Sequence, residues 1–328
     1  MKEHHMKNEK STTIAVIGAG YMGGGMAQVF ALSGYRCLLA DANFEIAQNS
    51  LNRLIRESEA FEAQGLFAKG STDLIVSNLH VAQSIEEASM QADYIAEVVP
   101  EVAEIKRDVL TRISGSARVD AIIASNTSAI PIAKLAAWVS NPVRFLGVHW
   151  MNPAPFVPGV ELIASPETSE EVLQFVEGLI GGVGKITCRV SDIAGFIANR
   201  LQFALYREAV TMFEEGSATP EEVDTVVSNT FGFRLAFFGP FAIADMAGLD
   251  VYAGAYRSLS EAYGERFSAP KALLEKTEAG EFGLKTGGGF IGLDVEQKDA
   301  IAAYRNRAYA ALSQLKKDLG PPPGFPAK

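Results

Sequence analysis

The sequence predicts an α/β fold in which a doubly wound parallel sheet, with helices on both faces, is followed by an all-helical C-terminal domain. Short apolar runs rich in β-branched residues alternate with helical segments over the first 190 residues or so, the pattern of a parallel sheet. The first of these runs ends in a cluster of glycines. Beyond about residue 195 the apolar residues recur almost throughout with a helical period.

The expected elements follow one another along the first half of the chain. A strand over residues 13–17 is followed by a helix from Met22 to Ser33, which Gly34 closes. A second strand over 36–40 ends at Asp41, and a long helical stretch of mixed charge follows over 44–67. Further strands are expected at 79–81, 94–99, 121–124, 145–148, 160–163 and 186–190.

A change of pattern near residues 190–194 predicts a domain boundary. We expect a nucleotide-binding domain over 11–192, a helical domain over 193–318, and flexible tails at 1–10 and 319–328. Thr219 before Pro220 is a typical N-cap and start for one of the helices in the second half. The long amphipathic stretch 196–216 carries more apolar surface than a small helical domain needs to bury, so a homodimer formed through this half is expected.

Composition restricts the class of protein. The chain has 328 residues and is 48% hydrophobic, which is enough for a substantial core, and its net charge of -10 argues against nucleic acid and membrane surfaces as partners. The N-terminus lacks the apolar segment of a signal peptide, and no apolar stretch approaches the ~20 residues of a membrane span. Two cysteines, Cys37 and Cys188, build no disulfide framework. We expect a cytoplasmic protein without a metal site, with His4 and His5 in the N-terminal tail.

The glycine cluster predicts a site for a nicotinamide dinucleotide. It lies between a predicted strand and a predicted helix, the context that a GxGxxG turn requires. Gly18 permits the tight turn, Gly20 lets the backbone approach the pyrophosphate, and Gly23 lets helix and strand pack closely. The alternatives are a turn without a ligand and an FAD site, whose partner motifs are not evident in the sequence. The cofactor contacts are expected at Gly18, Ala19, Gly20, Tyr21, Met22 and Gly23.

Asp41 indicates which dinucleotide binds. It ends the second predicted strand, at the position where a carboxylate accepts hydrogen bonds from the ribose hydroxyls and repels a 2′-phosphate. No Arg or Lys follows within several residues of Asp41. The expected cofactor is therefore NAD and not NADP.

The chemical site is expected around His149. Oxidation of an alcohol by hydride transfer needs a base that takes the hydroxyl proton. Of the four histidines, two lie in the tail and His80 lies inside a predicted strand. His149 directly follows a strand-like run, at the edge where a parallel sheet presents its ligands.

Several spaced motifs resemble, in the same order, those of the L-3-hydroxyacyl-CoA dehydrogenase family. The resemblance extends from about residue 13 to residue 290 and implies a Rossmann-type domain, NAD as the cofactor, and reversible oxidation of an L-3-hydroxyacyl-CoA to its 3-keto form in fatty acid metabolism. The motifs are Ser125-Asn126-Thr127-Ser128, His149-Trp150-Met151-Asn152-Pro153, Val160-Glu161-Leu162-Ile163, Gly195-Phe196-Ile197-Ala198-Asn199-Arg200-Leu201 and Lys285-Thr286-Gly287-Gly288-Gly289-Phe290.

The resemblance also implies roles for the catalytic residues. His149 matches the base, and Glu161 matches the carboxylate that orients the imidazole and stabilises its charged form. Ser128 and Asn199 match the groups that hydrogen-bond the reacting oxygen of the substrate, and Asn152 matches a substrate-site asparagine that supports the histidine. The simpler alternatives are helix caps at Ser128 and Asn199 and a surface position for Glu161.

Three further residues match cofactor-contacting positions of the same family. They are Glu101, Lys106 and Asn126.

Other segments resemble a neighbouring branch of the family, which acts on free 3-hydroxy acids such as L-gulonate and L-carnitine and includes lambda-crystallin. These segments are the proline-rich stretch 153–158 and residues 199–204, whereas the motif at 285–290 favours the acyl-CoA enzymes. In the region expected near CoA, the basic residues Arg53, Arg56 and Lys69 are interleaved with Glu57, Glu59 and Glu62, which is typical of a solvated helix face. A 3-hydroxyacyl-CoA is therefore the expected substrate, a free 3-hydroxy acid is the alternative, and a non-catalytic, crystallin-like nicotinamide-binding protein is the alternative from another class.

Overall fold

The computed structural model describes residues 12–324. The chain consists of two compact units that divide between Ala204 and Leu205, and each is described by itself. The tail expected at 1–10, with His4 and His5, and residues 325–328 of the tail expected at 319–328 lie outside the described residues.

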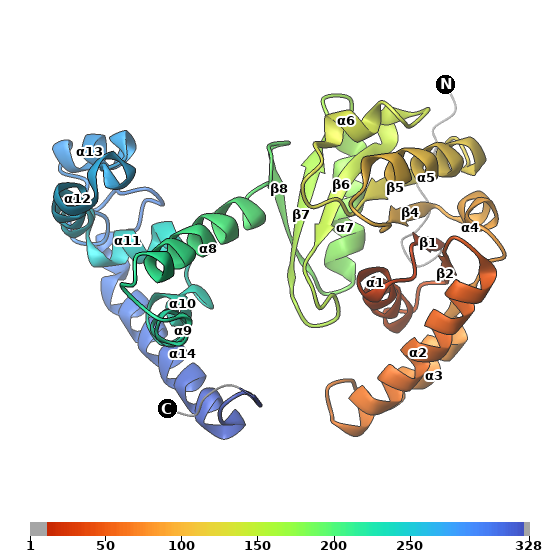
Figure 1. The fold of residues 1–328 in the computed structure, drawn as a ribbon, viewed down its shortest axis with the longest axis horizontal. Helices are drawn as coiled ribbons and strands as arrows, with labels where there is room; N and C mark the ends of the chain where they lie inside the picture. Colours follow the sequence, from red (N-terminus) through yellow and green to blue (C-terminus); the bar gives the residue numbers. More distant parts are fainter. Residues whose placement is uncertain (1–11, 325–328) are drawn as a thin grey trace. The chain divides into compact units, whose positions relative to one another are not determined.

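An eight-stranded sheet of order β3-β2-β1-β4-β5-β6-β7-β8 forms the centre of the first unit (Figure 1). Every predicted strand is present, within two residues at either end. The strands are β1 (Ile14–Ile17), β2 (Cys37–Ala40), β3 (Leu79–Val81), β4 (Tyr94–Glu97), β5 (Ile122–Ser125), β6 (Phe145–Trp150), β7 (Gly159–Ala164) and β8 (Ile186–Val190).

Helices cover both faces of this sheet, as the predicted fold class requires. Alternate residues of β1 point to opposite faces, so Ile14 and Val16 belong to one hydrophobic core and Ala15 and Ile17 to the other. The helices are α1 (Tyr21–Leu32), α2 (Phe44–Ala63), α3 (Ser71–Asn78), α4 (Ile85–Gln91), α5 (Ala103–Ser116), α6 (Ile132–Ala136), η2 (Pro142–Arg144) and α7 (Glu170–Gly182).

Two details differ from the expected elements. Strand β7 runs antiparallel to β6, and β8 runs parallel to β7, so the last two strands oppose the other six. The segment 151–158 between β6 and β7 contains no crossover helix, and so short a connection reverses the chain. The helical stretch expected over 44–67 ends at Ala63, and the turn that follows contains Gly65 and Gly70 with positive φ.

The second unit is helical, as predicted. Thr219 caps α9, because its hydroxyl accepts a hydrogen bond from the Glu222 N–H while the Glu222 carboxylate accepts one from the Thr219 N–H. Helix α8 (Ala198–Glu214) begins in the first unit and ends in the second. The elements of the second unit are α9 (Pro220–Asn229), α10 (Phe231–Leu235), α11 (Pro240–Ala247), α12 (Leu249–Tyr263), η3 (Gly264–Phe267), α13 (Lys271–Glu278), η4 (Val295–Gln297) and α14 (Lys298–Leu319).

Within residues 12–324, no single helix is long and apolar enough to cross a bilayer. The pair Pro220–Leu235 and Pro240–Ala247, bent by 87°, has sufficient length and apolar composition only when the two are taken together.

Candidate active site

The turn between β1 and α1 depends on glycine for two different reasons. Gly18 has a φ of +110°, and a Cβ on it would lie 2.6 Å from the carbonyl oxygen of Val98. A Cβ on Gly23 would lie 1.9 Å from the carbonyl oxygen of Gly18, whereas a Cβ on Gly20 would meet nothing within 4 Å. Packing therefore requires Gly18 and Gly23, while Gly20 leaves the outer side of the turn open for a ligand.

Asp41 contacts the same turn. Its Oδ2 accepts a hydrogen bond from the Ala19 N–H at 2.5 Å, and its Oδ1 accepts one from the Ala42 N–H at 2.7 Å. The carboxylate thus stands at the carboxyl edge of β2, beside the start of α1. Free N–H groups at the start of a helix suit a pyrophosphate, and a carboxylate at this edge suits ribose hydroxyls. The residues of this turn therefore fit NAD.

His149 and Glu161 lie directly opposite each other in the antiparallel pair β6–β7. Both are buried, and His149 Nδ1 lies 2.8 Å from Glu161 Oε2. Because an ionised carboxylate only accepts hydrogen bonds, Nδ1 carries the hydrogen of a neutral imidazole, and Nε2 keeps a lone pair that can take a proton. This is the arrangement that a general base requires.

The other oxygen of Glu161 is bound to the start of α8. Glu161 Oε1 accepts hydrogen bonds from the N–H groups of Ile197 at 3.0 Å and Ala198 at 2.9 Å. Phe196, just before them, has a φ of +46°, is fully buried and packs on the imidazole of His149, with ring centroids 5.6 Å apart. A non-glycine residue held at positive φ costs of order 1–3 kcal/mol, and the burial of this ring offsets that cost.

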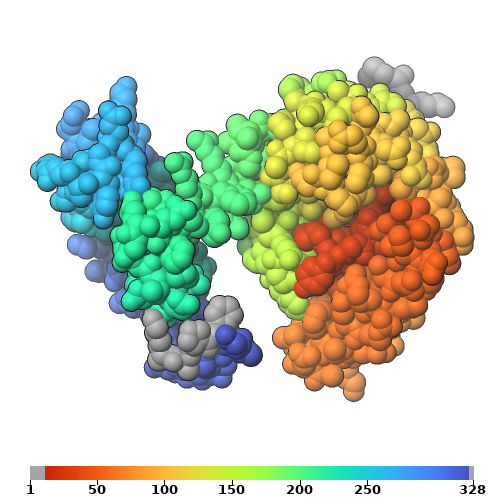
Figure 2. Space-filling view, in the orientation of Figure 1, coloured from red at the N-terminus to blue at the C-terminus, as the bar shows by residue number. Residues whose placement is uncertain are grey.

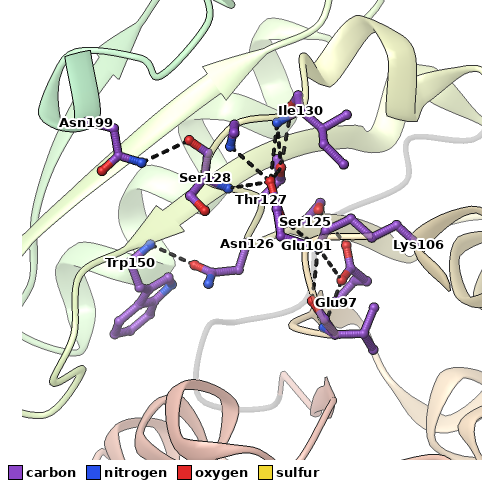
Figure 3. A network of polar contacts seen from close by, with 12 residues as sticks. Glu97, Glu101, Lys106, Ser125, Asn126, Thr127, Ser128, Ile130, Trp150 and Asn199 are labelled. Carbon is purple, nitrogen blue, oxygen red and sulfur yellow. Dashed lines mark hydrogen bonds and ion pairs between the residues drawn. The ribbon is translucent and has the colours of Figure 1, made fainter. Parts of the chain in front are cut away.

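Ser128 and Asn199, the two residues predicted to hydrogen-bond the reacting oxygen of the substrate, lie next to each other. Asn199 Nδ2 donates a hydrogen bond to the backbone carbonyl of Ser128 at 3.0 Å (Figure 3). Among residues 12–324, the Ser128 hydroxyl makes no hydrogen bond, so it is free for a substrate. Asn126 accepts a hydrogen bond from the Trp150 N–H at 2.8 Å and so ties the loop after β5 to the residue next to His149. Asn152 is exposed, and the structure shows no contact between its side chain and these groups.

Glu101 and Lys106 belong to a polar network below that loop, in which Lys106 and Glu97 are buried and Glu101 is partly exposed (Figure 3). Lys106 Nζ lies 2.8 Å from Glu97 Oε1 and 3.4 Å from Glu101 Oε2, and the side chain of Lys106 is 1% exposed. The Ser125 hydroxyl donates to the second oxygen of Glu97. The structure therefore places Lys106 inside the domain, as the counter-ion of two carboxylates.

Glu101 connects this network to the loop after β5. Its Oε1 accepts hydrogen bonds from the Thr127 hydroxyl and from three consecutive backbone N–H groups, those of residues 128–130. Burial raises the pKa of Glu101, but the Thr127 hydrogen bond and the charge of Lys106 outweigh it and hold that pKa below its usual value. The carboxylate is thus ionised at neutral pH and fixes the loop that presents Ser128.

The sequence reasoning missed Glu97 and Thr127. The available signal was an ionisable residue at the end of the apolar strand β4, because a buried carboxylate needs a cationic partner. Among residues 12–324, no group of three or more His, Cys, Asp or Glu side chains is arranged to hold a metal ion. The catalytic and binding roles of the site residues stay predictions.

Comparison with known proteins gives a consistent result. Residues 13–193 match the NAD-binding domain of 3-hydroxyacyl-CoA dehydrogenase, and residues 195–292 match the C-terminal domain of the same enzyme family. The 5-formyl-3-hydroxy-2-methylpyridine 4-carboxylate 5-dehydrogenase of Mesorhizobium japonicum is 36% identical over 92% of this chain and 97% of its own. A probable 3-hydroxybutyryl-CoA dehydrogenase of Bacillus subtilis is 34% identical over 87% of this chain and 98% of its own. The crystal structure of a 3-hydroxyacyl-CoA dehydrogenase from Archaeoglobus fulgidus superposes with a TM-score of 0.74 and 30% identity, over 94% of this chain and 99% of that one.

The two glycines of the turn allow a matched pair of variants. Gly23→Ala should lower the free energy of unfolding by about 2 kcal/mol or more, because its methyl group collides with the Gly18 carbonyl. Gly20→Ala should leave stability unchanged and weaken NAD binding about tenfold or more, because its methyl group enters the space open to the pyrophosphate. Urea unfolding and calorimetric titration with NAD measure the two effects. Equal loss of stability in both variants would contradict this distinction.

Asp41 should set the preference between the two nicotinamide dinucleotides. We expect kcat/KM with NAD to exceed that with NADP by at least about tenfold, or about 1.4 kcal/mol, and Asp41→Ala to narrow this ratio. The ratio is insensitive to any general loss of folded enzyme, which affects both cofactors alike. Equal turnover of NAD and NADP by the unmodified enzyme would refute the role of Asp41.

Proposed function

The chain belongs to the 3-hydroxyacyl-CoA dehydrogenase family, and from this premise we propose that it oxidises the hydroxyl group at C3 of an L-3-hydroxyacyl-CoA reversibly to the ketone. The observation that carries the proposal is the buried pair of His149 and Glu161 at the carboxyl end of β6. Binding of a dinucleotide alone would not require a base held in one tautomer.

Each site residue then has a chemical task. The Ser128 hydroxyl and the Asn199 amide hold the substrate oxygen, and Nε2 of His149 removes its proton. Glu161 stabilises the imidazolium that results, and two backbone N–H groups bind Glu161 Oε1 and hold the carboxylate in its buried position. NAD, when bound, supplies the acceptor for the hydride that leaves C3.

A free hydroxy acid is the second candidate substrate, and the charge of the α2–α3 hairpin favours it. The hollow between these helices is lined by the acids Glu59, Glu62 and Asp73 and by one base, Lys69. Such a surface repels the phosphates of CoA. The relative from Mesorhizobium japonicum, named for a pyridine carboxylate, shows that this sequence family extends to dehydrogenases of free carboxylates.

We also propose that the enzyme forms a homodimer through its helical half. Several large apolar side chains of α8 are exposed in the single chain, an arrangement that a second copy would cover. They are Leu201, Phe203, Leu205, Tyr206 and Phe213.

The base and its partner can be tested separately. His149→Ala should lower kcat by about 10² to 10⁴, the usual contribution of a positioned base, with NAD affinity unchanged. Glu161→Gln should also lower kcat strongly, because an amide does not stabilise the imidazolium as a carboxylate does. His80→Ala and Glu167→Gln, both exposed, serve as controls. Near-normal turnover of the His149 variant at neutral pH would assign the proton transfer to another residue.

A substrate panel distinguishes the two candidates. NADH formation is compared for L-3-hydroxybutyryl-CoA, L-3-hydroxybutyrate, gulonate and carnitine, and the thioester should give the highest kcat/KM. Lys69→Glu should lower kcat/KM for the thioester, because it removes the basic residue of the hairpin hollow, and should leave the free acids unaffected. A higher kcat/KM for a free acid than for the thioester, together with an unchanged kcat/KM in Lys69→Glu, would replace the acyl-CoA by the free hydroxy acid as the proposed substrate.

A further inference from the structure

Arg53 lies on the nucleotide turn, although it is twelve residues beyond Asp41 in the sequence. Its NH2 group is 3.4 Å from the carbonyl oxygens of both Ala19 and Gly20, and its NH1 group is 2.8 Å from Glu57 Oε1. The side chain is 32% exposed. The guanidinium is therefore directed inward from α2 to the start of α1, away from the solvated helix face that the sequence pattern predicted.

Packing fixes the guanidinium in this place. Leu54, the next residue of α2, is 1% exposed and anchors the helix in the core. A Cβ on Gly24 of α1 would lie 2.9 Å from the Leu54 side chain and 3.0 Å from Arg53 NH2. The absence of a side chain at Gly24 is thus what lets α2 approach α1 closely enough for Arg53 to reach the turn.

The contacts of Arg53 leave part of the guanidinium unused. Of its five N–H donors, one binds Glu57 and two face the carbonyl groups at the upper limit of hydrogen-bond length. Among residues 12–324, no acceptor is found for the Nε hydrogen or the second NH1 hydrogen. Carbonyl groups do not neutralise a cation, and Glu57 neutralises it only in part because the pair is one-third exposed to solvent.

The guanidinium also stands where an anion is expected. Gly20 has open space in front of it, and Tyr21, the first residue of α1, is 64% exposed. Figure 2 shows this part of the chain, in red, at the bottom of a hollow that α2 borders in orange. Three features that suit a phosphate group lie together here. They are the free N–H groups of a helix start, the open space at a glycine and a cation with unused donors.

We propose that Arg53 binds the diphosphate of the nicotinamide dinucleotide. The guanidinium has N–H donors on Nε and NH1 left for phosphate oxygens, and it adds a full positive charge to the partial charge of the helix start. The proposal rests on NAD as the cofactor and is independent of which hydroxy acid the enzyme oxidises. Arg53 thereby supplies a determinant of cofactor affinity that lies outside the glycine motif.

Direct binding measurements test this role without any turnover. Calorimetric titration of the full-length protein with NAD, ADP and adenosine separates contacts to the diphosphate from contacts to the base and ribose. Arg53→Gln should weaken NAD and ADP binding about tenfold, the usual effect of one charge-assisted hydrogen-bonded pair, and leave adenosine unchanged. Arg56→Gln, which removes the same charge from an exposed position one turn along α2, should change none of the three.

Salt dependence provides the second measurement. The difference between the unmodified protein and Arg53→Gln in NAD affinity should shrink as the salt concentration rises, because an ionic contact is screened. Equal weakening of adenosine and ADP would show that Arg53 only supports the turn, and this would overturn the proposal. Unchanged NAD and ADP binding with a raised KM for the acid substrate would overturn it as well, because the guanidinium would then bind the substrate anion.

Discussion

The site depends on one carboxylate, that of Glu161, which joins three segments of the chain. One oxygen contacts the imidazole on β6, and the other accepts two N–H groups at the start of α8. Both contacts are hydrogen bonds to a buried carboxylate, and together they use both of its oxygens. The orientation of the base and the position of the backbone at Ile197 and Ala198 are therefore fixed by the same side chain. The strained backbone at Phe196 is part of this arrangement, since it directs the next two N–H groups at Glu161.

A second buried charge group supports the neighbouring strand ends. Glu97 and Lys106 form an ion pair with almost no exposure, and Glu101 extends it to the loop after β5. Removal of one partner from such a pair costs about 3–5 kcal/mol, because the other charge is left buried and alone. The loop that carries Ser128 is thus attached, through Glu101, to a buried ion pair. Pre-organisation of this kind limits the movement needed when a substrate binds.

Much of the fold and part of the site could be predicted from the sequence, and the limits have physical causes. Apolar runs identify the strands, and the glycine turn identifies the dinucleotide site. Both patterns depend on residues that are close together in the sequence, the first through side-chain burial and the second through backbone sterics. The direction of β7 is not a local property, because an apolar run gives the same sequence pattern in a parallel and in an antiparallel strand. Only the short connection after Trp150 indicates that β7 is antiparallel to β6. His149 and Glu161 were assigned as partners by resemblance, and their hydrogen bond follows from the strand register. The contact of Arg53 with the glycine turn could not be predicted, because it joins elements distant in sequence, whereas Glu97 was missed although its place at the end of an apolar strand was a signal.

The pairing of β6 with β7 also limits which insertions and deletions this protein can tolerate. His149 faces Glu161 across an antiparallel ladder, in which side chains alternate between the two faces of the sheet. A slip of one residue would turn Glu161 to the opposite face and leave the imidazole without its carboxylate. Residues can therefore be gained or lost between Trp150 and Gly159 only if the connection absorbs the change as a bulge without shifting the strand. The connection 151–158 is thus held at both ends by the ladder that pairs the base with its carboxylate, since Trp150 and Val160 form its last pair.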